Sequence, residues 1–341
     1  MNLMMLLEMA AASMGEREAL VCEGERWTHA QLFAGAGRAA AKVRAAGVER
    51  VALLDVSSPA VPLALFASAW AGKPFVPLNY RLSGPELDAL IERVKPALLI
   101  TDRERVAQLA GREGVRVMLR EELLAAARES LPPPEADWSM EPEDVAIWLF
   151  TSGTTGAPKA ALLRHRHLVS YILGSVEFMS ADESDAALVS VPPYHVAGIT
   201  NLLTNLYLGR RIVYLGQFDA AGWVRAVREH AITHAMVVPT MLARIGQVLE
   251  ASGAGLPSLR AISYGGARTP ATVLQQVMRL LPDVDLTNAY GLTETSSTIA
   301  VLGPADHRAA RDGDPAALAR LASAGTVLPT VEVQVRGPEG E

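Results

Sequence analysis

The sequence predicts an α/β protein whose parallel sheets are covered by helices on both faces. Short β-rich apolar runs alternate with longer helical patterns along most of the chain, and this order is typical of units in which a helix connects two parallel strands. Half of the 341 residues are apolar and a fifth are charged, as in ordinary globular domains. A chain of this length is expected to form two or more compact units.

The chain opens with an apolar stretch over residues 1–14, which lacks a basic segment and contains Glu8. We therefore expect an amphipathic first helix and not a signal peptide. The longest uncharged stretch, residues 56–72, contains two prolines and falls short of the roughly 20 residues that a membrane span requires. We expect a cytoplasmic protein with no membrane span.

Apolar runs of two lengths predict the elements that follow. Runs of three to six residues predict strands at 51–56, 75–77, 97–101, 145–150, 187–191, 211–214, 234–238, 261–264 and 285–289. Longer periodic runs predict helices at 62–72, 85–94, 201–208, 220–230, 241–252 and 269–280, and residues 161–169 are also compatible with a helix.

Two further segments have a distinct character. Residues 131–142 carry three consecutive prolines and end in a fourth, which predicts an exposed connection. Residues 327–336 alternate, with Val331, Val333 and Val335 on one face, which predicts an exposed antiparallel strand.

Charge and cysteine content exclude several classes of protein. The net charge is −6, and no cluster of five or more Lys or Arg occurs, so we expect no nucleic-acid partner. The single cysteine, Cys22, cannot form an intrachain disulfide and has no metal-ligand spacing around it. We interpret it as a small buried apolar residue.

The most informative stretch is Thr151–Lys159, which reads TSGTTGAPK and directly follows the predicted strand at 145–150. Glycines allow successive N–H groups to converge on an anion, while hydroxyls and a lysine add donors and charge. The Walker A pattern does not fit, because Pro158 precedes the lysine and Ala160 follows it. The alternative is a solvated linker, but the motifs further along the chain favour a phosphate-binding loop for a nucleotide.

Those motifs occur in a fixed order. Upstream of the loop are WTHAQL at residues 27–32 and WAGKPFVPLN at 70–79; downstream are PYHVAG at 193–198, YGGA at 264–267 and NAYGLTE at 288–294. Together they resemble the adenylate-forming superfamily of acyl-CoA synthetases, aryl-CoA ligases, peptide-synthetase adenylation domains and firefly luciferase. The resemblance covers essentially the whole chain. Ala160, and the substituted Arg164–His167 segment, depart from the usual pattern and bear on the geometry of the loop.

The resemblance implies two doubly wound, mostly parallel sheets flanked by helices, plus the start of a small β-barrel. It divides the chain into one subdomain of about 1–48 and 185–303, a second of about 49–184, and an incomplete barrel of about 322–341. It also implies that the chain is the large N-terminal domain only and lacks the mobile C-terminal domain with its catalytic lysine, so we expect this fragment to be poorly active.

The resemblance also assigns roles to individual residues. It places the β- and γ-phosphates of ATP at the loop, Mg²⁺ near Thr154 and Glu294, the α-phosphate at Thr293, and catalytic roles at Lys159, His195, Thr293 and Glu294. The nucleotide-binding set is Thr151, Ser152, Gly153, Thr154, Thr155, Gly156, Lys159, Gly265, Gly266, Ala267, Asn288, Ala289, Tyr290, Gly291 and Thr293. The substrate-pocket set is His195, Gly198, Tyr264, Ser297 and Thr298.

Structural alternatives stand beside these roles. Thr293 and Glu294 could instead cap a helix and favour its dipole, the glycine pair could form a simple tight turn, and a lone histidine is often structural. If His195 is functional, we expect it to orient the acid and not to act as a base, because a carboxylate is already ionised at pH 7.

The implied reaction has two steps. The carboxylate of a small acid attacks the α-phosphorus of Mg·ATP, giving an acyl-adenylate and pyrophosphate, and coenzyme A then displaces AMP. Asn79, at a position where amino-acid-activating members commonly have Asp, favours an acyl- or aryl-CoA ligase. The alternatives are delivery of the adenylate to a carrier protein or separate enzyme, and a non-catalytic nucleotide-binding module. The sequence leaves the acid open and allows an oligomer.

Overall fold

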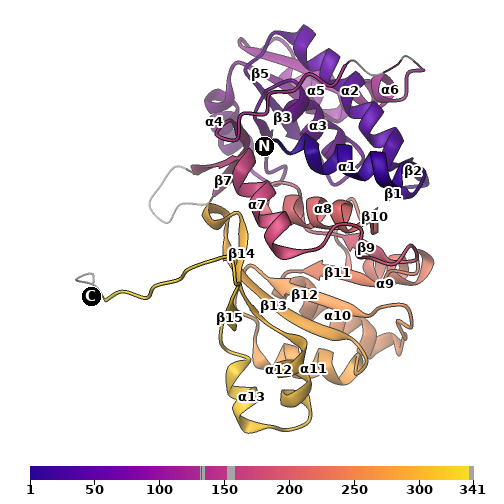
Figure 1. The fold of residues 1–341 in the computed structure, drawn as a ribbon, viewed down its shortest axis with the longest axis vertical. Coiled ribbons are helices and arrows are strands. Elements are labelled where there is room, and N and C mark those ends of the chain that lie inside the picture. Colours follow the sequence, from indigo (N-terminus) through magenta and orange to yellow (C-terminus); the bar gives the residue numbers. More distant parts are fainter. Residues whose placement is uncertain (131, 133–134, 152–157, 338–341) are drawn as a thin grey trace.

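The computed structural model describes residues 1–130, 132, 135–151 and 158–337, and its two sheets are stacked along the long axis of the molecule (Figure 1). The larger sheet has the order β15-β14-β13-β12-β11-β9-β10-β1-β2. From β13 to β1 neighbouring strands are parallel, and β2, β14 and β15 are antiparallel at the two ends. Its strands are β1 (Glu18–Cys22), β2 (Glu25–Thr28), β9 (Ala186–Val189), β10 (Arg211–Tyr214), β11 (His234–Val237), β12 (Ala261–Gly265), β13 (Asp285–Leu292), β14 (Ser297–Leu302) and β15 (Thr326–Val327).

The smaller sheet has the order β6-β5-β3-β4-β7-β8. All of its neighbouring strands are parallel except the last pair, β7 and β8. Its strands are β3 (Arg50–Leu54), β4 (Phe75–Pro77), β5 (Ala97–Thr101), β6 (Val115–Leu119), β7 (Val145–Thr151) and β8 (Lys159–Arg164). These ranges lie inside the predicted subdomain of about 49–184.

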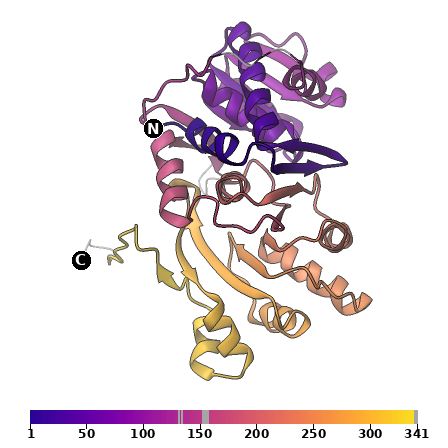
Figure 2. The same cartoon turned by 45° about the vertical axis from the view of Figure 1, so that its right-hand side comes forward.

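Helices cover the faces of both sheets. The largest core joins β3, β5 and β7 of the smaller sheet to β1, β9 and β10 of the larger one through α1, α2, α3 and α8, and Figure 2 shows α1 at the level between the sheets. A second core fills the other face of the larger sheet. The helices are α1 (Met4–Met14), α2 (His29–Ala46), α3 (Ala60–Trp70), α4 (Gly84–Val94), α5 (Arg103–Leu109), α6 (Arg120–Ala127), α7 (His165–Ser175), α8 (Val196–Leu208), α9 (Ala220–Glu229), α10 (Pro239–Ser252), α11 (Ala271–Leu280), α12 (Pro304–Arg311), α13 (Pro315–Arg320) and the 3₁₀ turn η1 (Thr293–Thr295).

Local sequence explains how these elements begin and end. At the start of α2, the N–H of Gln31 donates to Thr28 Oγ1 at 3.2 Å, and the N–H of Thr28 donates to Gln31 Oε1 at 3.0 Å. This reciprocal cap satisfies two N–H groups that a helix leaves free. The same helix ends at Gly47, whose φ of 61° is left-handed and favours glycine. All five residues of β5 are buried, as expected of a strand inside a parallel sheet.

The predicted α/β fold class is confirmed, but two local predictions are wrong. Residues 159–164 form β8, antiparallel to β7, and the helix begins only at His165. An apolar run such as Ala161–Leu163 suits either element, and pairing with β7 decides in favour of a strand. The predicted phosphate-binding loop therefore lies between two antiparallel strands and does not lead directly into a helix.

The second error concerns the predicted strand at 327–336. Only Thr326 and Val327 form a strand, β15, and residues 328–337 form none. The alternating valines do not gain a covering layer, since Val333 is 49% and Val335 is 93% exposed. The start of a barrel over about 322–341 stays a prediction. Within the described residues, no helix is both long enough and apolar enough to cross a membrane.

Candidate functional site

The larger sheet brings several predicted residues to one edge. Strands β9, β11, β12 and β13 are parallel neighbours, so their carboxyl ends lie at the same edge, where ligands of such sheets gather. The segment containing His195 follows β9, Gly266 follows β12, and Thr293 follows β13. These positions are far apart in the sequence, and the sheet order brings them to one edge.

The hairpin of β7 and β8 approaches this edge from the smaller sheet. Thr151 pairs with Lys159 across the hairpin, and the Thr151 hydroxyl donates to the Lys159 carbonyl at 3.4 Å. The predicted residues Ser152, Gly153, Thr154, Thr155 and Gly156 lie outside the described residues. Lys159 is exposed and forms no ion pair with another described residue. Its ammonium group is therefore available to a ligand.

Strand β8 contacts η1, which contains Thr293 and Glu294. In η1 the hydroxyl of Thr295, and not that of Thr293, accepts the N–H of Leu292, at 2.9 Å. Glu294 is exposed and pairs with no described cation. The alternative that Thr293 caps a helix does not apply to this three-residue turn. The lysine-bearing strand and the glutamate-bearing turn thus meet, although more than a hundred residues separate them.

A cavity of about 300 Å³ lies beside η1 and the ends of β12 and β13. Its walls include the predicted nucleotide-binding residues Gly266, Ala267, Asn288, Ala289, Tyr290 and Gly291. Gly266 has a left-handed φ of 86°, which a side chain would strain. Gly265 does not line the cavity, but a Cβ there would overlap the carbonyl oxygen of Ala289 on β13. A partly apolar space lined by small residues and the half-exposed Tyr290 suits a purine ring.

The sequence missed part of this cavity. Arg268, Thr269, Leu292 and the segment Leu321–Ala324 also line it. The hydroxyl of Thr269 is buried and lacks a partner among the described residues, so it can bond a ligand. Residues 321–324 follow α13 and carry no motif, and only the path of the chain reveals them. The exposed residues Ala322 and Ser323 within this segment gave no sequence signal.

Tyr264 differs from its predicted place. We expected it in the substrate pocket, but it lines the same cavity as the nucleotide candidates, and its hydroxyl lies 2.7 Å from His307 Nε2. Successive residues of a strand point to opposite faces, so Ser263 and Tyr264 lie on opposite faces of the larger sheet. Burial raises the pKa of Tyr264, which keeps the phenol protonated and suits a structural bond.

A second cavity of about 150 Å³ lies between the larger sheet and helices α7 and α8. The predicted residues Ser297 and Thr298 line it, and Ala289 lines both cavities. The sequence missed most of its other polar walls, which come from α8, β11 and the residue before β10. Those residues are Thr200, Asn201, Thr204, Asn205, Arg210 and His234.

His195 and Gly198 lie at the start of α8, outside the lining of either cavity. A Cβ at Gly198 would overlap the carbonyl oxygen of Pro192, so glycine allows the tight entry into the helix. The rings of Tyr194 and His195 have centroids 4.6 Å apart. His195 is partly exposed. Burial nevertheless lowers its pKa, and the charge of Arg81 lowers it further. A neutral imidazole is therefore favoured at pH 7.

Arg93 of α4 is a further residue that the sequence did not single out. Its guanidinium donates to the Pro158 carbonyl and lies over the Phe150 ring at 5.1 Å. Both contacts fall at the ends of the predicted phosphate-binding loop. Arg93 therefore ties helix α4 to both strands of the β7–β8 hairpin near the loop that joins them.

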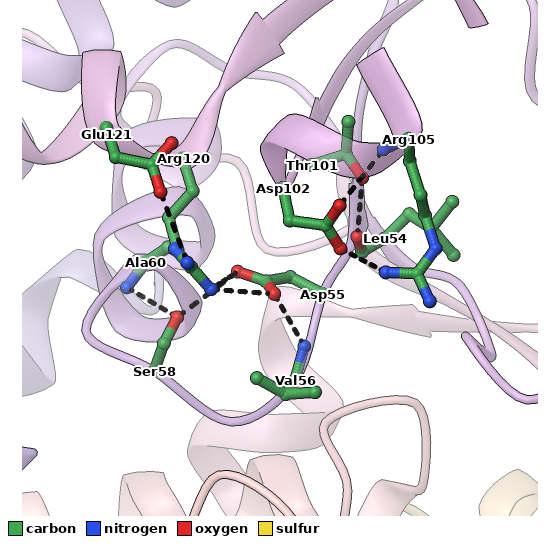
Figure 3. A network of polar contacts seen from close by, with 10 residues as sticks. All are labelled: Leu54, Asp55, Val56, Ser58, Ala60, Thr101, Asp102, Arg105, Arg120 and Glu121. Atoms are coloured by element: carbon green, nitrogen blue, oxygen red, sulfur yellow. Dashed lines mark hydrogen bonds and ion pairs between the residues drawn. The ribbon is translucent and has the colours of Figure 1, made fainter. Parts of the chain in front are cut away.

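A separate polar cluster lies at the carboxyl edge of the smaller sheet (Figure 3). Asp55 is 2% exposed, and Arg120 Nη1 donates to its two oxygens at 3.0 and 3.1 Å. The N–H of Val56 adds a bond of 2.8 Å. Burial raises the pKa of Asp55 in spite of these partners. No described group of three His, Cys, Asp or Glu could hold a metal, and the bonds join β3 to α6, so this cluster is structural.

Comparisons with known proteins give the same family as the motifs. The family described as AMP-binding enzyme matches residues 7–341. A feruloyl-CoA synthase of Amycolatopsis sp is 34% identical over 325 residues, which cover 93% of this chain and 62% of that protein. A fatty acid–[acyl-carrier-protein] ligase, ScoC of Streptomyces coeruleorubidus, is 31% identical over 303 residues, covering 85% of this chain and 58% of that protein. The chain thus spans about three fifths of the length of these relatives.

Solved structures agree on the fold. The o-succinylbenzoate coenzyme A synthetase of Bacillus subtilis, in complex with ATP and magnesium ion, superimposes with a TM-score of 0.83 at 26% identity. The match covers 98% of this chain and 67% of that one.

Proposed function

Because the chain belongs to the AMP-binding enzyme family, we propose that it activates a carboxylic acid with ATP to an acyl-adenylate, releasing pyrophosphate, and that coenzyme A then displaces AMP to give a thioester. The observation that carries this proposal is the contact between β8, which begins with Lys159, and η1, which contains Glu294. Beside that contact lies the cavity of about 300 Å³ lined by six predicted nucleotide-binding residues. Two cavities that share Ala289 suit a nucleotide and an acid that react at their junction.

The residues present fit a magnesium triphosphate. Glu294 offers an exposed carboxylate, a ligand type that Mg²⁺ prefers and usually combines with phosphate oxygens. Lys159 offers an ammonium group that forms no ion pair with another described residue, on the contacting strand, and Thr293 offers a hydroxyl in the same turn as Glu294. When bound, Mg·ATP supplies the electrophilic phosphorus and a pyrophosphate leaving group. Thr154 is also proposed as a magnesium neighbour, on the resemblance alone.

The protein's own contribution is to position charge and donors. A carboxylate and a polyphosphate repel each other, and fixed cations and N–H groups at the site lower that repulsion as the new bond forms. We assign contacts with phosphate oxygens to Lys159 and Thr293, and orientation of the acid without removal of a proton to His195, which is neutral at pH 7. Holding acid and nucleotide in adjoining cavities adds the benefit of orientation.

Calorimetric titration with Mg·ATP and with AMP tests the proposal. Lys159→Ala is expected to weaken Mg·ATP binding by about 10- to 100-fold, the usual loss for one charge-assisted phosphate contact, and to leave AMP binding within about threefold. Lys42→Ala is the matched control, because Lys42 is 51% exposed on α2 and pairs only loosely with Glu129 at 3.9 Å. Equal loss for AMP and ATP, or no loss for either, would contradict the assignment.

A second function is delivery of the acyl group to a carrier protein. The observation that favours it is the similarity to an acyl-carrier-protein ligase. Thioester formation with coenzyme A and with a phosphopantetheinyl carrier, measured in parallel, separates the two. A non-catalytic nucleotide-binding module would bind Mg·ATP in a Lys159-dependent way and release no pyrophosphate with any acid.

A further inference from the structure

The second cavity is lined by hydrogen-bond donors that the protein leaves unused. Arg210 Nε and Asn201 Nδ2 are buried and have no partner among the residues that the structure describes. Both residues line the cavity of about 150 Å³. Buried donors without partners are costly, so they are rare unless a ligand or water satisfies them.

Arg210 moreover forms no ion pair with another residue that the structure describes. Its Nη1 donates to Asn205 Oδ1 at 3.3 Å and its Nη2 lies 3.1 Å from His234 Nε2, and both partners are neutral groups. The nearby Asp185 is instead bonded to Arg260 at 3.0 Å. Although burial lowers the pKa of Arg210, a guanidinium keeps its charge in proteins. The cavity therefore has a positive end.

Hydrogen bonds fix the orientation of the neighbouring imidazole. The Thr233 hydroxyl donates to the Ala186 carbonyl at 3.1 Å and accepts the Ala186 N–H at 3.0 Å. Its remaining lone pair accepts from His234 Nδ1 at 2.8 Å, which leaves His234 Nε2 as the acceptor for Arg210. Burial and then the charge of Arg210 lower the pKa of His234 to about 4, so this arrangement persists at pH 7.

The positive end lies far from the reacting edge of the sheet. His234 pairs with Ala261 at the beginning of β12, whereas Gly265 and Ala289 pair at its carboxyl end. Four residues of strand separate these levels, which is about 13 Å. Ser297, Thr298 and Ala289 therefore form the near end of the cavity and Arg210 and His234 the far end.

From this geometry we propose that the acid substrate carries a second anionic group, such as a carboxylate, at the end of the molecule opposite to the carboxylate that is activated, and that Arg210 and Asn201 bind it. The inference rests on the proposed function for the identity of the near end. A cavity of about 150 Å³ accommodates a group of the size of benzene, which suits a compact diacid. It is too small for a long alkyl chain, and its donors would remain unsatisfied beside one.

Two matched acids test the inference: 3-phenylpropanoate and 3-(4-carboxyphenyl)propanoate, with adenylate trapped by hydroxylamine. The wild-type protein is expected to prefer the diacid by tenfold or more in kcat/KM. Arg210→Met is expected to lower kcat/KM for the diacid by about 10- to 100-fold and to leave the monoacid within about threefold. Arg228→Met, which removes an exposed guanidinium of α9 outside the cavity lining, is the control and should preserve the preference.

A second variant guards against loss of structure in the first. Asn201→Asp keeps an oxygen that can accept from Asn205 Nδ2 but places a negative charge beside the second carboxylate, so it should also erase the preference for the diacid. Equal use of the two acids by the wild-type protein, or a preference that both variants retain, would overturn the inference.

Calorimetric binding of the two acids separates this inference from the proposed function. If no acid yields an adenylate and Mg·ATP does not bind, the proposed function fails. Tighter binding of the diacid that depends on Arg210 would then still support the anion site, and equal binding by Arg210→Met would refute it.

Discussion

Acidification should destabilise this protein through histidines that the fold keeps neutral, and His29 is the clearest case. His29 is 0% exposed, and both of its ring nitrogens lack a partner among the described residues. Burial, and then the charge of Arg17, lower its pKa from 6.5 to about 4. The folded protein therefore excludes a proton that the unfolded chain accepts below pH 6.5.

The sign and magnitude follow from this difference. The contribution of neutral, buried His29 to the free energy of unfolding is fully present above pH 6.5. It is lost as the pH falls towards 4, because the unfolded state then binds more protons than the folded state. A shift of one pKa unit corresponds to 1.36 kcal/mol. Between pH 7 and pH 5 the loss is about 2 kcal/mol for this one residue, and it approaches about 3 kcal/mol below pH 4. Burial also lowers the pKa of His165 and His234 to about 4, so each adds to the total.

Urea unfolding followed by tryptophan fluorescence at pH 7 and pH 5 measures the effect. The fall in free energy of unfolding between these pH values should be smaller by about 2 kcal/mol in His29→Leu than in the wild-type protein. Leu32→Ala, on the same buried face of α2 and 1% exposed, is the control: it should lose stability at both pH values and keep the full pH dependence. A His29→Leu protein whose pH dependence matches that of the wild type would refute this reasoning.

Two further predictions concern backbone contact and buried charge. Gly265→Ala should push β12 away from Ala289 and weaken AMP binding by tenfold or more in a calorimetric titration. Gly255→Ala is the control, because the added Cβ meets nothing within 4 Å, and it should leave AMP affinity unchanged. Equal AMP affinities of the two variants would contradict the tight approach of β12 and β13. Arg120→Met should leave Asp55 buried without its cation and lower the free energy of unfolding by about 3 kcal/mol. Arg44→Met, at the exposed pair with Asp137, is the control and should lower it by less than about 1 kcal/mol. Similar losses for the two variants in urea unfolding would contradict a larger contribution of the buried Asp55 pair.

The sequence was most informative where one local pattern decides a structure. Alternating apolar runs predicted the parallel strands, and β4, β5 and β10 match the predicted ranges, because strands buried on both faces are continuously apolar. The small residues of Gly266 and Ala267 and the ring of Tyr290 were predicted as neighbours, and they line one cavity.

Features that depend on distant partners could not be predicted in this way. Strand β8 was mistaken for a helix because its pairing with β7 decides its structure. Most of the polar walls of the second cavity were missed because α8, β11 and the residue before β10 each contribute only one or a few of them. Arg210 illustrates the reason: a single arginine before a strand carries no local signal, and only its burial without a counter-ion marks it. Asp55 and Arg120 are likewise 65 residues apart.

The central claim is that Lys159 and Glu294 act on the same magnesium triphosphate, and a double-mutant cycle tests it most directly. Mg·ATP affinity is measured for the wild-type protein, Lys159→Ala, Glu294→Gln and the double variant, with AMP as the ligand that lacks the outer phosphates. If both groups hold one ligand, the two losses should deviate from additivity by about 1 kcal/mol and AMP affinity should change little. Losses that add within about 0.3 kcal/mol, or that are equally large for AMP, would contradict a shared triphosphate site.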